Sequence, residues 1–282
     1  MELNYTNHLN KTKFMKTLRL LGVALFTVLL SVSFTACGDD EGNDGSGDKP
    51  SINKRLVKVT TQEGSSTFSD EFTYDSNGRV VKVVNKKNGN NSSQTIYTYT
   101  DNHIVKKQYN TGSSTVKETE YVLENGLIVE EINTSGYNYK YSYDKGYLAT
   151  VTKKKEGKGG EYNYTWENGN LKRKQKVNSE SEDSYEYTSY VTPQNFYYLD
   201  YIEYVNGELA PFYGKSSKNL LSKRIDVTIN DVSSIGNPNA TEKVTEVYSC
   251  DWTMKDGLPV KLIVTEDKQS GSSTMIVDFE WE

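Results

Sequence analysis

Several side chains in this sequence belong to types that carry chemistry, and their spacing decides which reactions are open to them. Carboxylate pairs are the first candidates: Glu118 and Glu120 share a face if their segment is a strand, and Asp200 and Glu203 flank an aromatic segment. Two carboxyl groups at the right separation are enough for glycoside hydrolysis. The chain holds 38 acidic residues, so such pairs arise by chance, and we predict no catalytic residues.

The other reactive side chains of the main part of the chain favour structural roles. His103 is the single histidine beyond residue 36, which leaves no typical histidine-containing zinc site. A serine triad needs a histidine close to its nucleophile, and nothing around His103 suggests one. His103 replaces a turn glycine of the repeat described below, so we expect a residue with positive φ. Cys250 alternates in phase with neighbouring aromatic residues and should point into the core. Gly214-Lys215-Ser216 is similar to the end of a phosphate-binding loop, but Leu209 stands where its first glycine belongs. We predict no metal and no cofactor.

The N-terminal region holds the other cysteine. Four basic residues precede an apolar run over residues 20–32, and Phe34-Thr35-Ala36-Cys37 follows, as in a signal peptide. The run is shorter than the about 20 apolar residues of a membrane-spanning helix. The motif resembles the lipobox of bacterial lipoproteins, with Phe34 in place of the usual leucine. This resemblance implies cleavage before Cys37, lipidation of its thiol and attachment to a membrane through that lipid. An ordinary signal peptide with an incidental cysteine is the alternative.

A polar segment separates Cys37 from the rest of the chain. Residues 1–36 are the predicted signal peptide, with either Met1 or Met15 as its start, and residues 37–51 form a tether rich in Gly, Asp, Asn and Ser that is too polar to fold. The acidic run after Cys37 resembles the export signal that sends Bacteroidota lipoproteins to the outer face of the outer membrane; a plain solvated linker is the alternative. The expected localisation is the outer membrane, on the cell-surface side.

Charge and cysteine content limit the partners and the fold. Without the signal peptide, which has four basic residues and one glutamate, the formal net charge changes from −5 to about −8. Nucleic acid is a poor partner for such a chain, because its binding needs a basic patch. The only cysteines are Cys37 and Cys250, so lipidation of the first leaves no internal disulfide and the fold must depend on its core.

The rest of the chain alternates apolar and polar residues, with turns such as Asn-Gly, Asp-Gly and Lys-Gly every 8 to 12 residues, which indicates antiparallel hairpins. One unit recurs: an aromatic-x-aromatic pair, a turn, and a lysine-rich Leu or Val strand. Its copies cover residues 72–81, 97–105, 121–129, 141–148, 164–171 and 252–260. We predict one all-β domain over residues 52–282, an antiparallel meander of hairpins that forms a strongly twisted sheet or an open barrel. Lysines that can protect its outer strands from further pairing include Lys82, Lys106, Lys107, Lys172 and Lys174.

An insert at about residues 193–224 interrupts the repeat. Pro193 and Pro211 break the alternation, and the insert holds either one short helix or a long loop packed over an open end of the sheet. Its aromatic side chains are too many to face one core, so they are candidates for stacking on a sugar or for binding a protein. These candidate ligand-binding residues are Tyr197, Tyr198, Tyr201, Tyr204, Phe212 and Tyr213.

The rhythm Tyr-x-Tyr-Asp-x-x-Gly-x-Leu resembles the YD repeats of bacterial Rhs-type proteins, which wind as antiparallel hairpins. Together with the lipobox, the acidic tether and the insert, the chain resembles Bacteroidota lipoproteins grouped in a domain-of-unknown-function family. The resemblance implies an exported β domain and transfers no catalytic residues. We expect a non-catalytic, surface-exposed module that binds a glycan or a protein. A structural or adhesive envelope protein is the alternative, and a carboxylate-based glycoside hydrolase is a third hypothesis.

Overall fold

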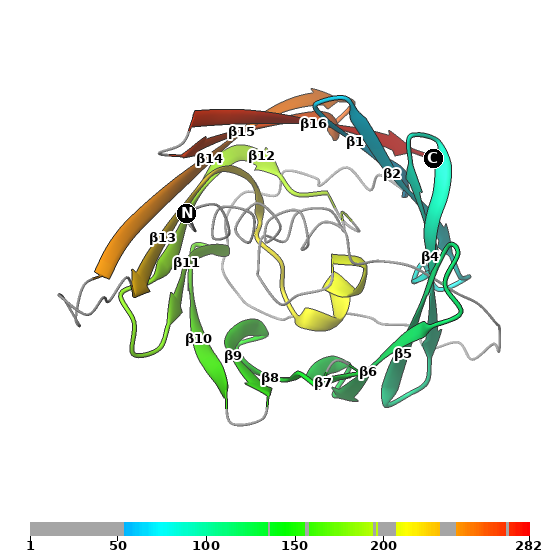
Figure 1. The fold of residues 1–282 in the computed structure, drawn as a ribbon, viewed down its shortest axis with the longest axis horizontal. Helices are drawn as coiled ribbons and strands as arrows, with labels where there is room; N and C mark the ends of the chain where they lie inside the picture. The colour runs from blue at the N-terminus through cyan, green and yellow to red at the C-terminus, as the bar shows by residue number, and fades with distance from the viewer. Residues whose placement is uncertain are drawn as a thin grey trace, which may run out of the picture.

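The computed structural model describes residues 54–134, 136–155, 158–193, 196, 207–231, 241–268 and 271–282, which form sixteen strands and one 3-10 helix (Figure 1). The predicted signal peptide, tether and Cys37 lie outside the described residues. The strands are β1 (Leu56–Glu63), β2 (Ser66–Tyr74), β3 (Val80–Lys87), β4 (Asn90–Tyr99), β5 (His103–Asn110), β6 (Val116–Glu124), β7 (Leu127–Asn133), β8 (Asn138–Asp144), β9 (Tyr147–Lys155), β10 (Lys158–Glu167), β11 (Asn170–Lys176), β12 (Glu182–Val191), β13 (Asn219–Asp231), β14 (Thr241–Lys255), β15 (Leu258–Lys268) and β16 (Gly271–Trp281). The helix is η1 (Gly207–Tyr213).

The strands form a closed antiparallel barrel in which each strand pairs with its neighbours in sequence and β16 pairs with β1. The predicted all-β meander is therefore confirmed, and the barrel is closed rather than open. At the seam Val59 pairs with Phe279, and both are buried. Beyond them Arg55 and Glu282 exchange two backbone hydrogen bonds, of 2.8 and 3.0 Å. Closure leaves the barrel without an outer strand that lysines would have to protect.

Tight turns join the strands at one end of the barrel, which we call the repeat end because the aromatic repeats lie there. Asn125 and Gly126 both have positive φ, 51° and 77°, as a two-residue type I′ turn requires. The same pairing recurs at Lys145-Gly146, Asn168-Gly169 and Asp256-Gly257. The expectation of a positive φ at His103 was wrong, because His103 has no positive φ and is the first residue of β5. The Thr100 hydroxyl closes this turn instead: it donates a hydrogen bond to the His103 carbonyl and accepts one from the His103 backbone N–H.

The second aromatic residue of a repeat anchors its hairpin to an earlier one. The Tyr143 hydroxyl, for example, donates a 2.6 Å hydrogen bond to the backbone carbonyl of Ile128. Equivalent bonds run from Tyr74 to Leu56, Tyr99 to Val80 and Trp166 to Leu148. Three aromatic residues that do not hold this position in the six copies make similar bonds: Tyr187 to Leu171, Trp252 to Leu221 and Trp281 to Pro259. Each bond satisfies a carbonyl near the barrel end while the ring covers the core, which explains why the sequence repeats an aromatic residue there.

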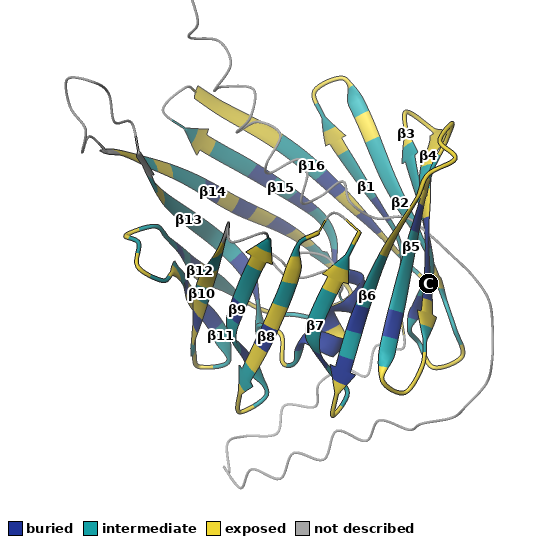
Figure 2. Ribbon diagram, turned by 60° about the horizontal axis from the view of Figure 1, so that its bottom comes forward, coloured by how far each residue is buried: buried dark blue, intermediate teal, exposed yellow. Residues whose placement is uncertain are grey.

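A β-bulge beside this aromatic residue turns two aliphatic side chains inward. The pairing of β2 with β3 skips Val81, so Val80 and Val83 both reach the interior, where each is at most 1% exposed. Leu148 and Val151 repeat this three-residue spacing in β9. The core therefore lies inside the barrel, and buried positions alternate with exposed ones along the strands (Figure 2). No helix among the described residues is long and apolar enough to cross a membrane.

Candidate functional site

The described end of the insert lies within the barrel, where η1 occupies the space enclosed by the strands (Figure 1). Of the two alternatives for the insert, a short helix or a long loop, the described residues Gly207–Tyr213 form the short helix. Leu209 is fully buried, and Phe212 and Tyr213 are buried beside it. Phe212 stacks on Tyr99 with ring centroids 5.7 Å apart, and Tyr213 meets the edge of Tyr141 at 5.2 Å. The helix is therefore part of the core.

Of the six candidate ligand-binding aromatics, these two are the ones that the structure describes. Tyr197, Tyr198, Tyr201 and Tyr204 lie outside the described residues, as do the acidic candidates Asp200 and Glu203. Because Phe212 and Tyr213 pack against barrel residues, they present no open ring to the exterior in this conformation. Their role in ligand binding stays a prediction.

An ionisable cluster surrounds the start of η1. Glu208 is 4% exposed, and the Tyr97 hydroxyl lies 3.4 Å from its carboxylate. Burial raises the pKa of Glu208 to about 8, although the Lys106 ammonium opposes that rise. Burial lowers the pKa of Lys106, and Glu208 and Glu131 counteract this effect. The Tyr141 hydroxyl donates a 3.1 Å hydrogen bond to Glu131. Charged groups in a low-dielectric interior persist only when they are paired in this way.

A second interior cluster joins β11, β12 and β13. The Arg224 guanidinium donates two hydrogen bonds to the Asp226 carboxylate and lies 3.6 Å from Asp183. Asp183 also pairs with the ammonium of Lys174 and accepts a 3.3 Å hydrogen bond from Tyr185. Burial raises the pKa of Asp226 to about 6, with Arg224 opposing the rise. The cluster is a satisfied network across three strands.

Two smaller groups continue the interior polar layer. Lys268 contacts Glu266 at 2.6 Å and Glu246 at 3.6 Å across β14 and β15. Asn85 donates a 2.6 Å hydrogen bond to Asp70, whose pKa burial raises to about 6. The barrel interior thus combines an aromatic and aliphatic layer at the repeat end with paired charges beyond it.

This interior polar layer was not predicted from the sequence, and two of its lysines were expected elsewhere. Lys106 and Lys174 were expected to protect outer strands, but both face the interior, and Lys174 is only 4% exposed. The spacing from buried residues indicates the inward direction of both lysines. Lys106 lies two residues after buried Ile104, and Lys174 lies three residues after buried Leu171, with a β-bulge between them.

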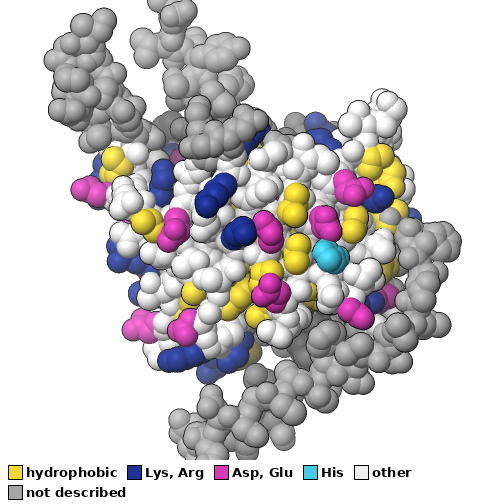
Figure 3. All heavy atoms as spheres, turned by 90° about the horizontal axis from the view of Figure 1, so that it is seen from below, with side chains coloured by type: hydrophobic (Ala, Val, Ile, Leu, Met, Phe, Trp, Pro, Cys, Tyr) yellow, Lys and Arg dark blue, Asp and Glu magenta, His cyan; other side chains and the backbone are white. Residues whose placement is uncertain are grey.

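The outer wall carries the other predicted pair of carboxylates. Glu118 and Glu120 share a face of β6, as expected, but that face points outward, where Lys107 contacts Glu118 at 3.1 Å and His103 lies 3.4 Å from Glu120. Figure 3 shows acidic and basic side chains interspersed with apolar ones over one side of the molecule. Each glutamate has a basic residue as its cross-strand neighbour on an open wall, an arrangement typical of solvated cross-strand pairs.

The remaining motif residues have structural places. Cys250 is buried between the inward aromatic rings of Tyr248 and Trp252, which confirms its predicted direction. Gly214 has φ of 87° and Lys215 donates a 2.7 Å backbone hydrogen bond to Gly146, so Gly214-Lys215-Ser216 is a turn that docks on the barrel end. Within the described residues, no group of three or more His, Cys, Asp or Glu side chains is arranged to hold a metal ion.

Comparisons with known proteins bear on the fold. No family model matches the sequence, and no curated protein matches it. Among solved structures the chain is similar to a porin-like protein from Bacteroides vulgatus, with a TM-score of 0.55 and 14% sequence identity. That match covers 82% of this chain and 99% of the other. At this identity the likeness shows that the two chains share a barrel fold.

Proposed function

We propose that the chain is a lipid-anchored module of the outer membrane that binds a glycan or a protein without catalysis, and that its barrel wall stands in water rather than in lipid. The lipobox around Cys37 supports the anchor. The barrel interior supports a binding role over conduction, because η1 and paired charges occupy it.

One observation supports the placement of the barrel wall in water: ion pairs join neighbouring strands on the outward face around the barrel. They are Lys58 with Glu280, Lys86 with Glu71, Lys107 with Glu118, Lys140 with Glu130, Arg173 with Glu182 and Lys223 with Glu186. A membrane-spanning barrel carries an apolar band on this face, and an outward lysine or arginine at mid-membrane costs about 2–4 kcal/mol. Six such pairs favour water as the surrounding medium.

The anchor is tested by changing each cysteine in the full-length chain. Cys37→Ser should abolish labelling by a radioactive fatty acid and move the protein from the membrane fraction to the soluble fraction. Cys250→Ser is the matched control: it removes the other thiol, so labelling and membrane attachment should persist. Membrane attachment of the Cys37→Ser protein would contradict lipid anchoring.

The solvated wall is tested with residues 50–282, which include every strand of the closed barrel. In buffer without detergent this protein should be a monomer by size-exclusion chromatography with light scattering, and it should give no conductance in planar bilayers. A protein that aggregates without detergent and conducts ions would overturn the proposal, because it would then behave as a pore.

A further inference from the structure

Lysine and tyrosine side chains gather inside the barrel at the end opposite the repeat end, which we call the far end. Tyr141 pairs with Val151, and both are buried in the core. Two residues further towards the far end, Tyr139 pairs with Lys153, so these side chains share the interior face. Lys155 follows on the same face. Strands β8, β9 and β10 thus bring a row of lysine and tyrosine side chains to the interior near this end.

Two ammonium groups of the row share one ring. The Lys153 ammonium lies 4.6 Å from the centroid of Tyr137, and the Lys155 ammonium lies 4.5 Å from it. Two cations at one ring concentrate positive charge beside Tyr137, and this charge attracts an anion. Lys176 extends the basic surface, because it pairs with inward-facing Tyr162 on β10.

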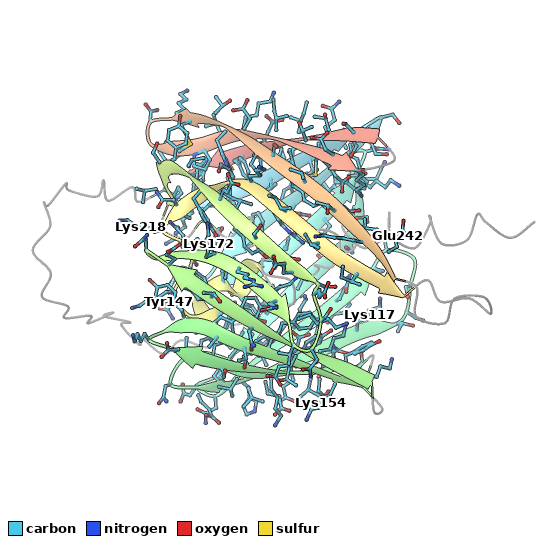
Figure 4. The ribbon with its side chains drawn as sticks, turned by 90° about the vertical axis from the view of Figure 1, so that its left-hand side faces the viewer. Lys117, Tyr147, Lys154, Lys172, Lys218 and Glu242 are labelled. Carbon is cyan, nitrogen blue, oxygen red and sulfur yellow. The ribbon has the colours of Figure 1, made fainter. Side chains whose placement is uncertain are left out.

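The opposite side of the same arc adds a further cation. Lys117 on β6 pairs with Gln108, which is buried in the interior, so Lys117 faces inward too. Lys117 and Lys176 are both exposed, whereas Lys153 and Lys155 are half-buried. Figure 4 labels Lys117 near the far end and Tyr147 at the repeat end. The cations therefore become more accessible to solvent towards the far end.

A glycine leaves backbone uncovered within this row. Gly160 on β10 is the partner of Lys153 and contributes no side chain to the interior. A Cβ at this position would lie 3.4 Å from the ring of Tyr162. A side chain at position 160 would contact the ring of Tyr162, so the glycine keeps space beside this ring, which suits the apolar face of a sugar.

We propose that this lysine–tyrosine strip, formed by Tyr137, Tyr139, Lys153, Lys155, Tyr162 and Lys176, binds an acidic polysaccharide that bears uronate or sulfate groups. The proposal rests on the binding role proposed above and names its ligand class. The lysines supply charge-assisted hydrogen bonds to the acid groups, and the tyrosine rings cover the apolar faces of the sugars. Because the chain as a whole is acidic, its field repels polyanions elsewhere and leaves this strip as the attractive site.

The test compares two double variants of the protein spanning residues 50–282, whose strands close on themselves. Lys153→Gln with Lys155→Gln removes two inward charges. Lys154→Gln with Lys140→Gln removes two outward charges from the same two-strand region; Lys154 and Lys140 are exposed, and Lys140 pairs with Glu130 on the outer wall. Both variants change the net charge equally, so a difference between them reports position.

Polygalacturonate and heparin are the acidic probes, dextran is the neutral polysaccharide and polyglutamate is the acidic peptide for comparison; calorimetry at fixed ionic strength measures affinity. The inward variant should bind polygalacturonate on the order of tenfold more weakly or worse, because two charge-assisted hydrogen bonds to the acid groups are lost. The outward variant should bind within about twofold of the parent, as expected for exposed charges. Dextran should not bind, and circular dichroism should be the same for all three proteins.

The outcomes separate this inference from the proposed function. Absence of polygalacturonate and heparin binding, equal losses in the two variants, or tighter binding of polyglutamate than of either polysaccharide would each overturn the acidic-polysaccharide site. A neutral glycan or a protein bound by a lipid-anchored monomer would still agree with the proposed function. A detergent-dependent pore would instead overturn the proposed function, whatever the probe binds.

Discussion

At the scale of single residues, the interior carboxyl groups make stability depend on pH in a direction opposite to that of ordinary salt-bridged acids. Burial raises the pKa of Asp70 from its usual 3.8 to about 6, while the hydrogen bond from Asn85 opposes the rise. The folded protein therefore holds this proton more tightly than the unfolded chain does. The free energy of unfolding that depends on Asp70 is greatest below about pH 4 and falls as the pH rises through about 6.

Asp70→Asn should remove this decline. Asparagine is neutral at every pH and its side-chain oxygen can still accept the hydrogen bond from Asn85. Above pH 7 the variant should be more stable than the parent by on the order of 1–3 kcal/mol, and near pH 4 the two should be similar. Urea denaturation at several pH values measures the difference. Asp251→Asn, at an exposed outward position, is the control, and a parallel pH profile for Asp70→Asn and the parent would contradict the assignment.

The aromatic anchors make a second prediction at this scale. Tyr143→Phe keeps the ring and removes the hydroxyl that donates to the carbonyl of Ile128, so the carbonyl loses its partner. The variant should lose about 1 kcal/mol of unfolding free energy, the usual net value of such a bond. Tyr109→Phe, at a site 38% exposed, should change stability by less than the experimental error. Equal effects at the two sites would show that the hydroxyl of Tyr143 does not act as an anchor.

At the scale of elements, the hairpin is the part of the fold that local sequence determines. Asn168-Gly169 predicts its type I′ turn, and the aromatic pairs predict the strands that enter such turns. The inward direction of Lys174 was not predicted, because a β-bulge shifts the alternation by one residue and strand periodicity alone assumes no such shift. The position of η1 was also not predictable from local sequence, because its contacts are with residues far away in the chain. Phe212, for example, stacks on Tyr99 of β4, more than a hundred residues earlier.

The helix η1 should contribute to stability as a core element does. Leu209 is fully buried within the barrel, so Leu209→Ala removes a packed side chain and leaves a cavity. Its cost should be about 2–5 kcal/mol, compared with less than about 0.5 kcal/mol for a surface change. Lys223→Ala, on the outer wall, is the control. If Leu209→Ala left the thermal midpoint unchanged, η1 would be an accessory that the barrel does not need for folding.

At the scale of the whole molecule, closure is what converts marginal hairpins into a stable domain. A two-stranded hairpin is barely stable in water, and a sheet with free edges invites pairing with other chains. No local signal pairs the first strand with the last, since Lys58 and Glu280, which meet at the seam, lie 222 residues apart. Local sequence therefore predicts a strongly twisted sheet or an open barrel and does not predict closure. Register accumulated over all sixteen strands brings β16 to β1.

Removal of β16 should therefore have consequences beyond the loss of one strand. A chain that ends at residue 268 leaves β1 and β15 with unpaired backbone groups and opens the interior, because Val277 and Phe279, both buried at the seam, are lost. We expect this protein to form soluble aggregates or inclusion bodies, as exposed strand edges do. Light scattering after chromatography measures the outcome. Removal of residues 1–49 instead, which touches no strand of the barrel, should leave a monomer. If the protein without β16 were a monomer with the parent's circular dichroism, this prediction would be wrong. That result would mean that β1 and β15 pair directly and that the strand register around the barrel can shift to allow it.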